Sequence, residues 1–312
     1  MKPLLPLYAG GDEFNHSPHI EEEYRPAIVE ICRRHRLSSD KTRKYDDGTT
    51  VVFAVEDDHV VKLYPPFWPK QFHLETVALR QILGRLGIPT PEVQFTGELE
   101  GWNYIVMTQL KGKPLTEIWS TLPRNEQVRI MGEIGEVVSR LHAVPTEEIG
   151  PLVDGWTELI GRQSLSCFER QKRGRLSEHW LNQIPDYLAK HLPSLPTDFS
   201  LALLHTELTY DVWLLDFQGG HWKLSGIFDF ADVLVGHHEA ELFNCKGDRE
   251  LFRAYLLNYG YTEDQLTPEW QNQKMTYILL HRYVGLNWFM KRMPSTTFAK
   301  SIEDIAALWF AF

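Results

Sequence analysis

The sequence predicts an α+β protein with a small sheet-and-helix part followed by a larger, mainly helical part. Short β-rich runs bounded by turn residues gather within the first 108 residues, whereas apolar residues at helical spacing dominate after about residue 114. The chain has 312 residues, which is enough for two lobes that share a cleft. We therefore expect one lobe over residues 1–108 and a second lobe over residues 109–312.

The first part is expected to alternate between helices and pairs of strands. The turn residues Glu56-Asp57-Asp58 separate the first two β-rich runs, and Gly87 is the expected stop of the helix that follows them. The predicted elements are, in chain order, a helix over residues 18–37, strands over Thr49–Val55 and His59–Tyr64, a helix over Gln71–Leu86, and strands over Glu92–Thr96 and Trp102–Met107.

The second part carries a helical pattern that one pair of strands interrupts. Val128, Met131 and Leu141 recur at helical spacing, which predicts a helix over residues 124–143. The other expected elements are a strand pair around residues 212–216 and 222–228 and helical segments up to residue 312.

Composition and charge narrow the class of protein. The formal net charge is −10, which disfavours a nucleic-acid partner. No apolar run reaches the roughly 18 residues that span a bilayer, and the N-terminus lacks the apolar stretch of a signal peptide. We therefore expect a cytoplasmic protein with no membrane partner. Cys32, Cys167 and Cys245 are far apart in sequence, which argues against a disulfide framework and against a zinc site.

The stretch that is most informative about chemistry places a histidine and an acid in one turn and a second acid after a hairpin. His205 and Glu207 lie in the first turn, and Asp229 follows the predicted strand pair. Phosphoryl transfer needs an acidic group near the acceptor hydroxyl, ligands for Mg²⁺ at the phosphates, and positive charge on the triphosphate. Glu207 suits the first of these needs and Asp229 suits the second.

These residues resemble the aminoglycoside phosphotransferase family. The run from His205 through Glu207 to Val212 is similar to the family's H-G-D-x-x-x-x-N loop, and Asp229-Phe230 is similar to its I-D-F/W turn. Two further segments are similar to the family's L-H-x-x-P helix end and its G-D-P-x-x-D-L segment, namely residues 140–145 and 236–242. The matches follow the family's order, and the resemblance covers roughly residues 40–290.

The resemblance implies a protein-kinase-like fold, with a small antiparallel-sheet N-lobe and a larger, mainly helical C-lobe. It also implies an ATP-dependent small-molecule O-phosphotransferase that uses ATP, or GTP in its place, together with Mg²⁺. The implied acceptor is a small molecule that carries a hydroxyl, of which aminoglycosides are one class, and the oligomeric state stays open. A protein kinase is disfavoured because no A-P-E-like segment follows Asp229.

The resemblance also assigns the nucleotide contacts of the N-lobe. Lys62 lies inside a β-run and would pair with the phosphates, and Glu75 on the following helix would hold it by an ion pair. Gly48 lies in the turn that would cover the phosphates. The expected hinge, whose backbone would bind the adenine edge, consists of Thr108, Gln109 and Leu110.

Two residues depart from the family pattern. Glu207 stands at the position of the catalytic Asp and is one methylene longer, while Val212 stands at the position of the metal-binding Asn and offers no donor atom. Glu207 would either orient or deprotonate the acceptor hydroxyl, or reach the metal instead. These departures motivate a second hypothesis, a catalytically inactive kinase-like protein that binds a nucleotide or a partner.

Three other polar residues have expected roles near this loop. His205 counts with Glu207 among the candidate catalytic residues; it is expected to brace the loop, as the family's His does, and direct participation in the chemistry is the alternative. Glu239 and Glu241 of the helical lobe are expected to attract a cationic acceptor.

Overall fold

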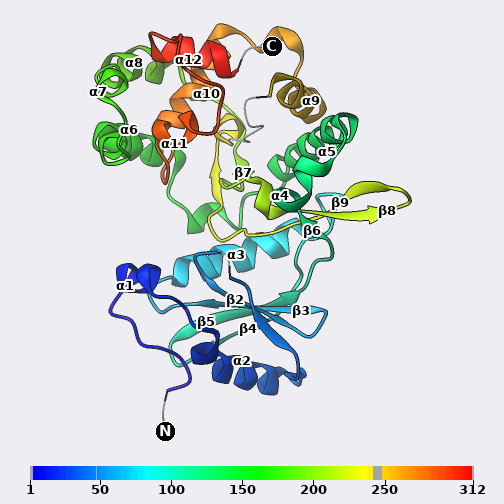
Figure 1. Ribbon diagram of the computed structural model, residues 1–312. Coiled ribbons are helices and arrows are strands. Elements are labelled where there is room, and N and C mark those ends of the chain that lie inside the picture. The colour runs from blue at the N-terminus through cyan, green and yellow to red at the C-terminus, as the bar shows by residue number, and fades with distance from the viewer. Residues whose placement is uncertain (1–2, 47, 242–247, 311–312) are drawn as a thin grey trace.

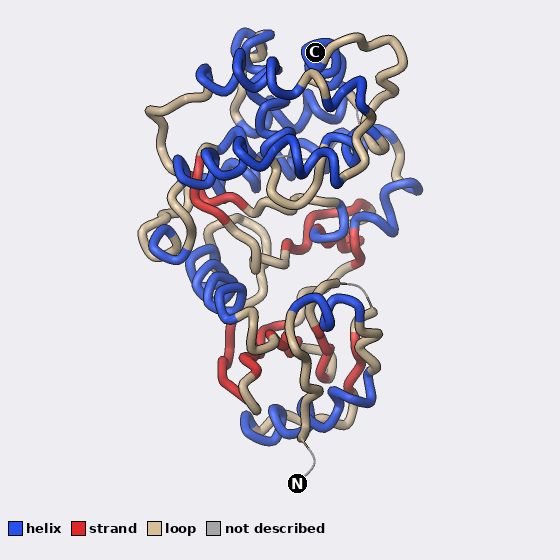
Figure 2. Tube along the Cα trace, turned by 90° about the vertical axis from the view of Figure 1, so that its left-hand side faces the viewer, coloured by secondary structure: helices blue, strands red, loops and turns tan. Residues whose placement is uncertain are grey.

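The chain folds into two lobes, one small and rich in strands, the other larger and mainly helical (Figure 1). The computed structural model describes residues 3–46, 48–241 and 248–310. A view turned by 90° shows the same division, with most of the helical turns in the larger lobe (Figure 2). The predicted boundary between residues 108 and 109 falls at the end of β5, the last strand of the N-lobe sheet.

The N-lobe is a five-stranded antiparallel sheet in the order β1-β2-β3-β5-β4. A helix covers each face, α2 on the outer side and α3 on the side toward the C-lobe (Figure 1). The elements are α1 (Gly11–His16), α2 (Glu21–His35), β1 (Thr42–Lys44), β2 (Val51–Val55), β3 (His59–Tyr64), α3 (Pro69–Ile82), β4 (Val93–Leu99) and β5 (Trp102–Thr108).

Alternation along the strands divides the apolar residues of the sheet between two cores. Side chains at successive strand positions point to opposite faces. Phe53, Val61 and Val106 therefore pack in the cluster that also holds buried residues of α2, whereas Ile105 and Met107 belong to the larger cluster that includes α3 and the C-lobe. Because the inner face is continuous with the C-lobe core, polar side chains on that face lie at the junction of the two lobes.

Helix α3 ends earlier than predicted. Its last residue is Ile82, four residues before the predicted end at Leu86. The reason is Gly84, whose φ of 72° lies in the left-handed region, where a helix cannot continue. Gly87, the predicted stop, also has a positive φ but lies in the loop beyond the helix.

The C-lobe is built on helices, with short strands at the surface that faces the N-lobe (Figure 1). Helix α5 packs closely against α9. The principal elements are β6 (Lys113–Pro114), α4 (Leu115–Ile118), α5 (Arg124–His142), α6 (Trp156–Arg173), α7 (Glu178–Leu181), α8 (Ile184–His191), β7 (Ala202–Leu204), β8 (Trp213–Gln218), β9 (His221–Ile227), β10 (Leu234–Gly236), α9 (Arg249–Tyr259), α10 (Pro268–Leu280), α11 (Leu286–Met290) and α12 (Ile302–Trp309).

Strand pairing brings two loops of the C-lobe together. Strands β7 and β10 pair with Leu204 opposite Leu234, and β8 pairs with β9 with Trp213 opposite Ile227. The loop over residues 205–212 and the loop over residues 228–233 are therefore anchored beside each other at both ends. This pairing places the turn of His205 and Glu207 next to the turn of Asp229.

The order of the predicted elements is confirmed, with end shifts of a few residues and several short elements that were not predicted. Helix α1 and strands β1, β6, β7 and β10 are too short to give a clear periodic pattern. Cys32 and Cys167 are buried and free, and Cys245 lies outside the described residues. Within the described part of the chain, no helix has the length and apolarity needed to cross a membrane.

Candidate active site

Lys62 is a buried lysine on the inner face of the sheet. It lies on β3, opposite Ile105 of β5, and its side chain is 6% exposed. Its Nζ lies 2.7 Å from Glu75 Oε2 and 2.7 Å from Asp229 Oδ1. The predicted ion pair between Lys62 and Glu75 is therefore confirmed, and Asp229 joins it from the C-lobe.

Glu75 connects the two lobes through three donors. Besides its ion pair with Lys62, Glu75 accepts a hydrogen bond from the hydroxyl of Tyr64, which lies on β3 as Lys62 does. Its other carboxylate oxygen accepts the backbone N–H of Phe230 at 3.3 Å, so the helix of the N-lobe holds the turn after Asp229. A buried carboxylate is stable only when it is paired and hydrogen-bonded, and Glu75 meets both conditions.

The charges of this group support one another. Burial alone would lower the pKa of the Lys62 ammonium, but the carboxylates of Asp229 and Glu75 outweigh it and hold that pKa above its usual range. The Lys62 ammonium in turn lowers the pKa of Asp229, against the opposing effect of burial. Lys62 is therefore cationic and Asp229 anionic across the physiological pH range. The Asp229 side chain remains 42% exposed, so it is accessible to a ligand.

His205 braces the two turns. The ring is fully buried, and its Nε2 donates to the Phe228 carbonyl at 3.0 Å, while its Nδ1 accepts the Glu207 N–H at 3.3 Å. Both ring nitrogens are thus engaged with the backbone of the two loops. These contacts favour the bracing role over direct chemistry.

Glu241 holds the backbone of the same loop. Its two carboxylate oxygens accept the N–H groups of His205 at 2.6 Å and of Thr206 at 2.9 Å. His142 at the end of α5 lies close to it, with its Nε2 3.7 Å from Glu241 Oε2. Two sequence segments about 100 residues apart, both similar to segments of one family, therefore meet under the loop.

The expectation that Glu239 and Glu241 attract an acceptor is wrong. Both side chains are buried, at 6% and 3% exposure. Glu239 is held by Lys274, whose Nζ lies 2.9 Å from its Oε2, and by the Trp270 indole N–H at 2.8 Å. The sequence could not reveal this burial, because the partners of Glu239 come from α10, about 30 residues further along the chain.

Glu207 differs from the other acids of the site. Its pKa is raised to about 7 by burial and by the nearby carboxylates of Asp232 and Asp229, and the cation of Arg282 offsets this effect in part. The side chain is half-buried. A carboxylate with a pKa near 7 exchanges protons readily at neutral pH, as a general base must.

Val212 supplies no ligand, so the fit of a Mg²⁺ ion depends on the remaining acids. Val212 is 4% exposed and belongs to the large apolar core. Among the described residues, no group of three or more His, Cys, Asp or Glu side chains is arranged to hold a metal ion by itself. Mg²⁺ in phosphotransferases is held by one or two carboxylates together with phosphates and waters. The anionic, partly exposed carboxylate of Asp229 fits that arrangement, with Glu207 as the second acid nearby.

The predicted nucleotide-contact residues lie in the loop between β1 and β2 and at the end of β5. Gly48 is in the loop between β1 and β2 and has a φ of 111°, a conformation that glycine adopts easily. The backbone N–H groups of Thr108 and Gln109 already donate to the carbonyls of Glu92 and Asp58. A base at this hinge would therefore rely on Leu110 and on the carbonyls of the hinge rather than on those two N–H groups.

Four residues of the site were not identified from the sequence. Tyr64 is recognisable in hindsight, because it lies two positions after Lys62 on the same face of a strand. Thr206, Asp232 and Arg282 gave no signal, since their contacts connect three loops that are distant in sequence.

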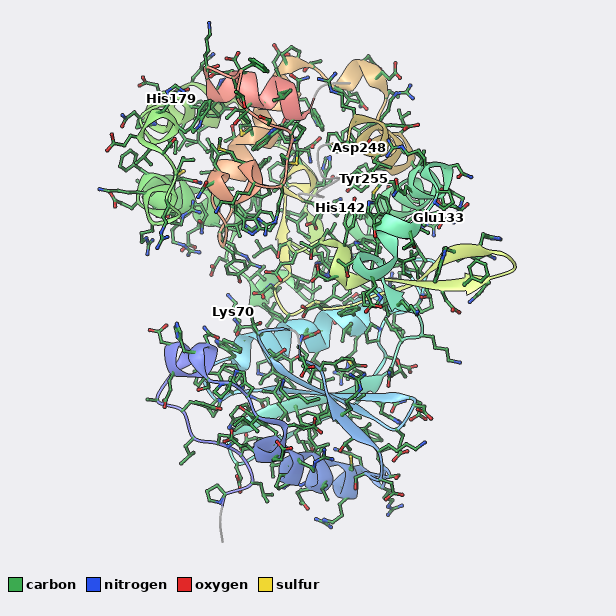
Figure 3. The ribbon with its side chains drawn as sticks, viewed as in Figure 1. Lys70, Glu133, His142, His179, Asp248 and Tyr255 are labelled. Atoms are coloured by element: carbon green, nitrogen blue, oxygen red, sulfur yellow. The ribbon has the colours of Figure 1, made fainter. Side chains whose placement is uncertain are left out.

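A hollow of about 670 Å³ lies elsewhere on the C-lobe. Its lining includes His179, Trp180, Met290 and Met293. His179 lies at the end of the C-lobe far from the N-lobe, whereas Lys70 marks the start of α3 beside the lobe junction (Figure 3). The hollow is therefore separate from the site around Lys62.

The fold and site together define a protein of the kinase-like class, with a lysine–glutamate pair in a sheet-rich lobe facing an aspartate turn in a helical lobe. Residues 41–271, well over half of the chain, match the phosphotransferase enzyme family, APH. The chain therefore belongs to this phosphotransferase family.

Several solved structures share the fold of this chain. The GDP and kanamycin complex of APH(2")-IIia has a TM-score of 0.67 at 16% identity, covering 81% of this chain and 89% of that chain. Macrolide 2'-phosphotransferase MphH from Brachybacterium faecium has a TM-score of 0.58 at 18% identity, covering 91% and 97%. At these identities the likeness concerns the fold.

A curated relative from a plant is much longer. The lysine-specific demethylase JMJ21 of Arabidopsis thaliana is 24% identical over an alignment of 221 positions, and the alignment covers 56% of this chain. The matched residues span 23% of that relative, so the chain corresponds to less than a quarter of its length.

Proposed function

We propose that the protein is an ATP-dependent O-phosphotransferase that moves the γ-phosphoryl group to a hydroxyl of a small molecule, with GTP as a substitute nucleotide. The observation that carries the proposal is the buried Lys62, held by Glu75 and facing Asp229 across the two lobes. Burying a lysine is costly even when two carboxylates balance its charge. Such a lysine suits phosphoryl transfer, in which the triphosphate replaces one of the carboxylates as its partner.

In this proposal, the triphosphate takes up part of the charge of Lys62. Glu75 keeps the ammonium in place from the N-lobe, and Asp229 would hold a Mg²⁺ ion, which would supply positive charge to the phosphates. Gly48 allows its loop to approach the phosphates closely. Thr108, Gln109 and Leu110 border the base.

Glu207 is proposed to accept the proton of the acceptor hydroxyl. Its pKa of about 7 in the free protein matches that task, and it lies in the loop that His205 fixes beside Asp229. Neighbours of the same fold are solved with kanamycin, gentamicin and streptomycin, which supports aminoglycosides as the first acceptors to test.

The direct test is a transfer assay with γ-labelled ATP or GTP and a panel of aminoglycosides, macrolides, sugars and small alcohols. The expected result is labelled product with at least one acceptor and a loss of about a hundredfold or more for Glu207→Gln. Asp198→Asn, an acid in an exposed loop, is the matched control and should keep the full rate. Equal rates for the wild type and Glu207→Gln would contradict the assigned role.

A second candidate is a protein that binds a nucleotide without transferring phosphate. The observation that favours it is Val212, which is buried in the apolar core where a metal-binding Asn would stand on the family pattern. Nucleotide binding that depends on Lys62 and Asp229, combined with no transfer to any acceptor, would select this candidate.

A further inference from the structure

Thr206 has a backbone conformation that threonine rarely adopts. Its φ is 73°, in the left-handed region, and the residue lies directly before Glu207. A β-branched side chain in this region is strained, and such strain persists only where the surroundings hold the residue in place. Contacts that hold Thr206 therefore also fix the point from which the Glu207 side chain leaves the backbone.

Every polar group of Thr206 is held. Its N–H donates to Glu241, as described above, and its hydroxyl donates to the Asp232 carbonyl at 2.9 Å. The same hydroxyl oxygen accepts a hydrogen bond from Arg282 Nη2 at 2.9 Å. The ring of His281 hydrogen-bonds to the Thr206 backbone. Two of these four contacts come from adjacent residues in one loop, which connects α10 to α11.

The same loop also holds the turn after Asp229. Arg282 donates to the Asp232 carbonyl, and its guanidinium lies 3.7 Å from the Asp232 carboxylate. The Tyr283 hydroxyl donates to that carboxylate at 2.5 Å, and the guanidinium lies 4.4 Å from the centre of the Tyr283 ring. Arg282 is 20% exposed, so its own contacts are largely sheltered from solvent, whereas Tyr283 lies at the surface.

We propose that His281, Arg282 and Tyr283 form a positioning device, which holds Thr206 in its left-handed conformation and so sets the place of Glu207 relative to Asp229. The functional part of this inference rests on the proposed phosphotransfer. These three residues lie beyond residues 41–271, the segment that matches the family. Arg282 is the central member, because it binds both turns through one guanidinium.

If these residues form such a device, Arg282 acts through Thr206. A double-mutant cycle measures the coupling between the two residues. In the full chain, Arg282→Gln should lower the melting temperature by about 5 °C, because charge-assisted hydrogen bonds to a strained residue are lost. In a Thr206→Gly background, where no strain needs to be held, the same change should cost about half as much. Arg282→Lys should retain part of the effect, and Arg173→Gln, on the exposed last turn of α6, should leave the melting temperature nearly unchanged.

A functional readout separates positioning from general damage. Arg282→Gln should bind Mg-ATP within about twofold of the wild type, since no hydrogen bond or ion pair of the described residues joins Arg282 to Lys62 or Asp229. The same variant should lower kcat about tenfold or more. Thr206→Gly in the same chain should restore part of that rate. Equal losses of melting temperature in both backgrounds would overturn the device, as would a loss of nucleotide affinity as large as the loss of rate. If no acceptor is phosphorylated, the proposed function fails, while the melting cycle still decides whether Arg282 acts through Thr206.

Discussion

The acidic residues on the two sides of the candidate site have different surroundings. On the N-lobe side, Glu75 accepts hydrogen bonds or an ion pair from Lys62, Tyr64 and Phe230 and is almost fully buried. On the C-lobe side, Glu207 lies among other carboxylates, and its pKa is raised to about 7 by burial and by those neighbours. Glu75 is therefore a structural acid, whose charge is balanced within the protein, whereas the carboxyl group of Glu207 exchanges protons near neutral pH.

The largest expected effect is on the free energy of unfolding, when one acid on each side of the site is truncated to alanine. Glu75→Ala should lower the free energy of unfolding by about 3–5 kcal/mol, because it leaves Lys62 buried with a single partner and frees the Tyr64 hydroxyl. Glu207→Ala, the same change on the other side, should not destabilise the protein at neutral pH. Urea denaturation measures both values. Similar losses for the two variants would break the comparison.

A substitution at Val212 tests whether a second metal-binding side chain on the C-lobe side strengthens nucleotide binding. Val212→Asn should lower the free energy of unfolding of the free protein by about 1–3 kcal/mol, because it buries an amide in the apolar core. It should also strengthen Mg²⁺-dependent ATP binding severalfold, since an amide oxygen is a suitable ligand. Calorimetry with and without Mg²⁺ measures the second effect, and Val212→Thr serves as the isosteric control. A destabilised variant with unchanged metal dependence would show that the side chain at 212 does not point toward the metal.

A smaller effect concerns the pH dependence that Glu207 contributes. Its folded-state pKa, about 7, lies above the ordinary value of 4.5, so its stabilising contribution is complete below about pH 4.5 and is lost as the pH rises through 7. Glu207→Gln should therefore be more stable than the wild type by about 1 kcal/mol at pH 8, a value reduced by solvent screening of the half-buried side chain. At pH 4.5 the two proteins should unfold alike. A constant difference across this range would contradict the raised pKa.

The sequence predicts the N-lobe side of the site better than the C-lobe side. Lys62 lies in a strand and Glu75 in the following helix, and the predicted ion pair follows from the packing of that helix on the inner face of the sheet. These contacts depend on elements that are close in the chain. The period of the strands and the spacing to the helix are visible without any tertiary information.

The C-lobe side depends on contacts that local patterns do not contain. Glu241 looked like an acid available to an acceptor, yet it is buried under the loop and binds two backbone N–H groups. Arg282 meets Thr206 across 76 positions of sequence. Such pairings are decided by how the helices of the C-lobe pack, and a single sequence gives no signal for them.

Isothermal titration calorimetry with ATP and GTP, with and without Mg²⁺, tests whether the site around Lys62 and Asp229 binds a nucleotide. The wild type is expected to bind at least one of the two nucleotides, and Mg²⁺ is expected to strengthen that binding. Asp229→Asn should lose the Mg²⁺ effect, and Lys62→Met should bind about tenfold more weakly or worse. Folded wild-type protein that binds neither nucleotide would contradict the account, as would binding that neither substitution changes.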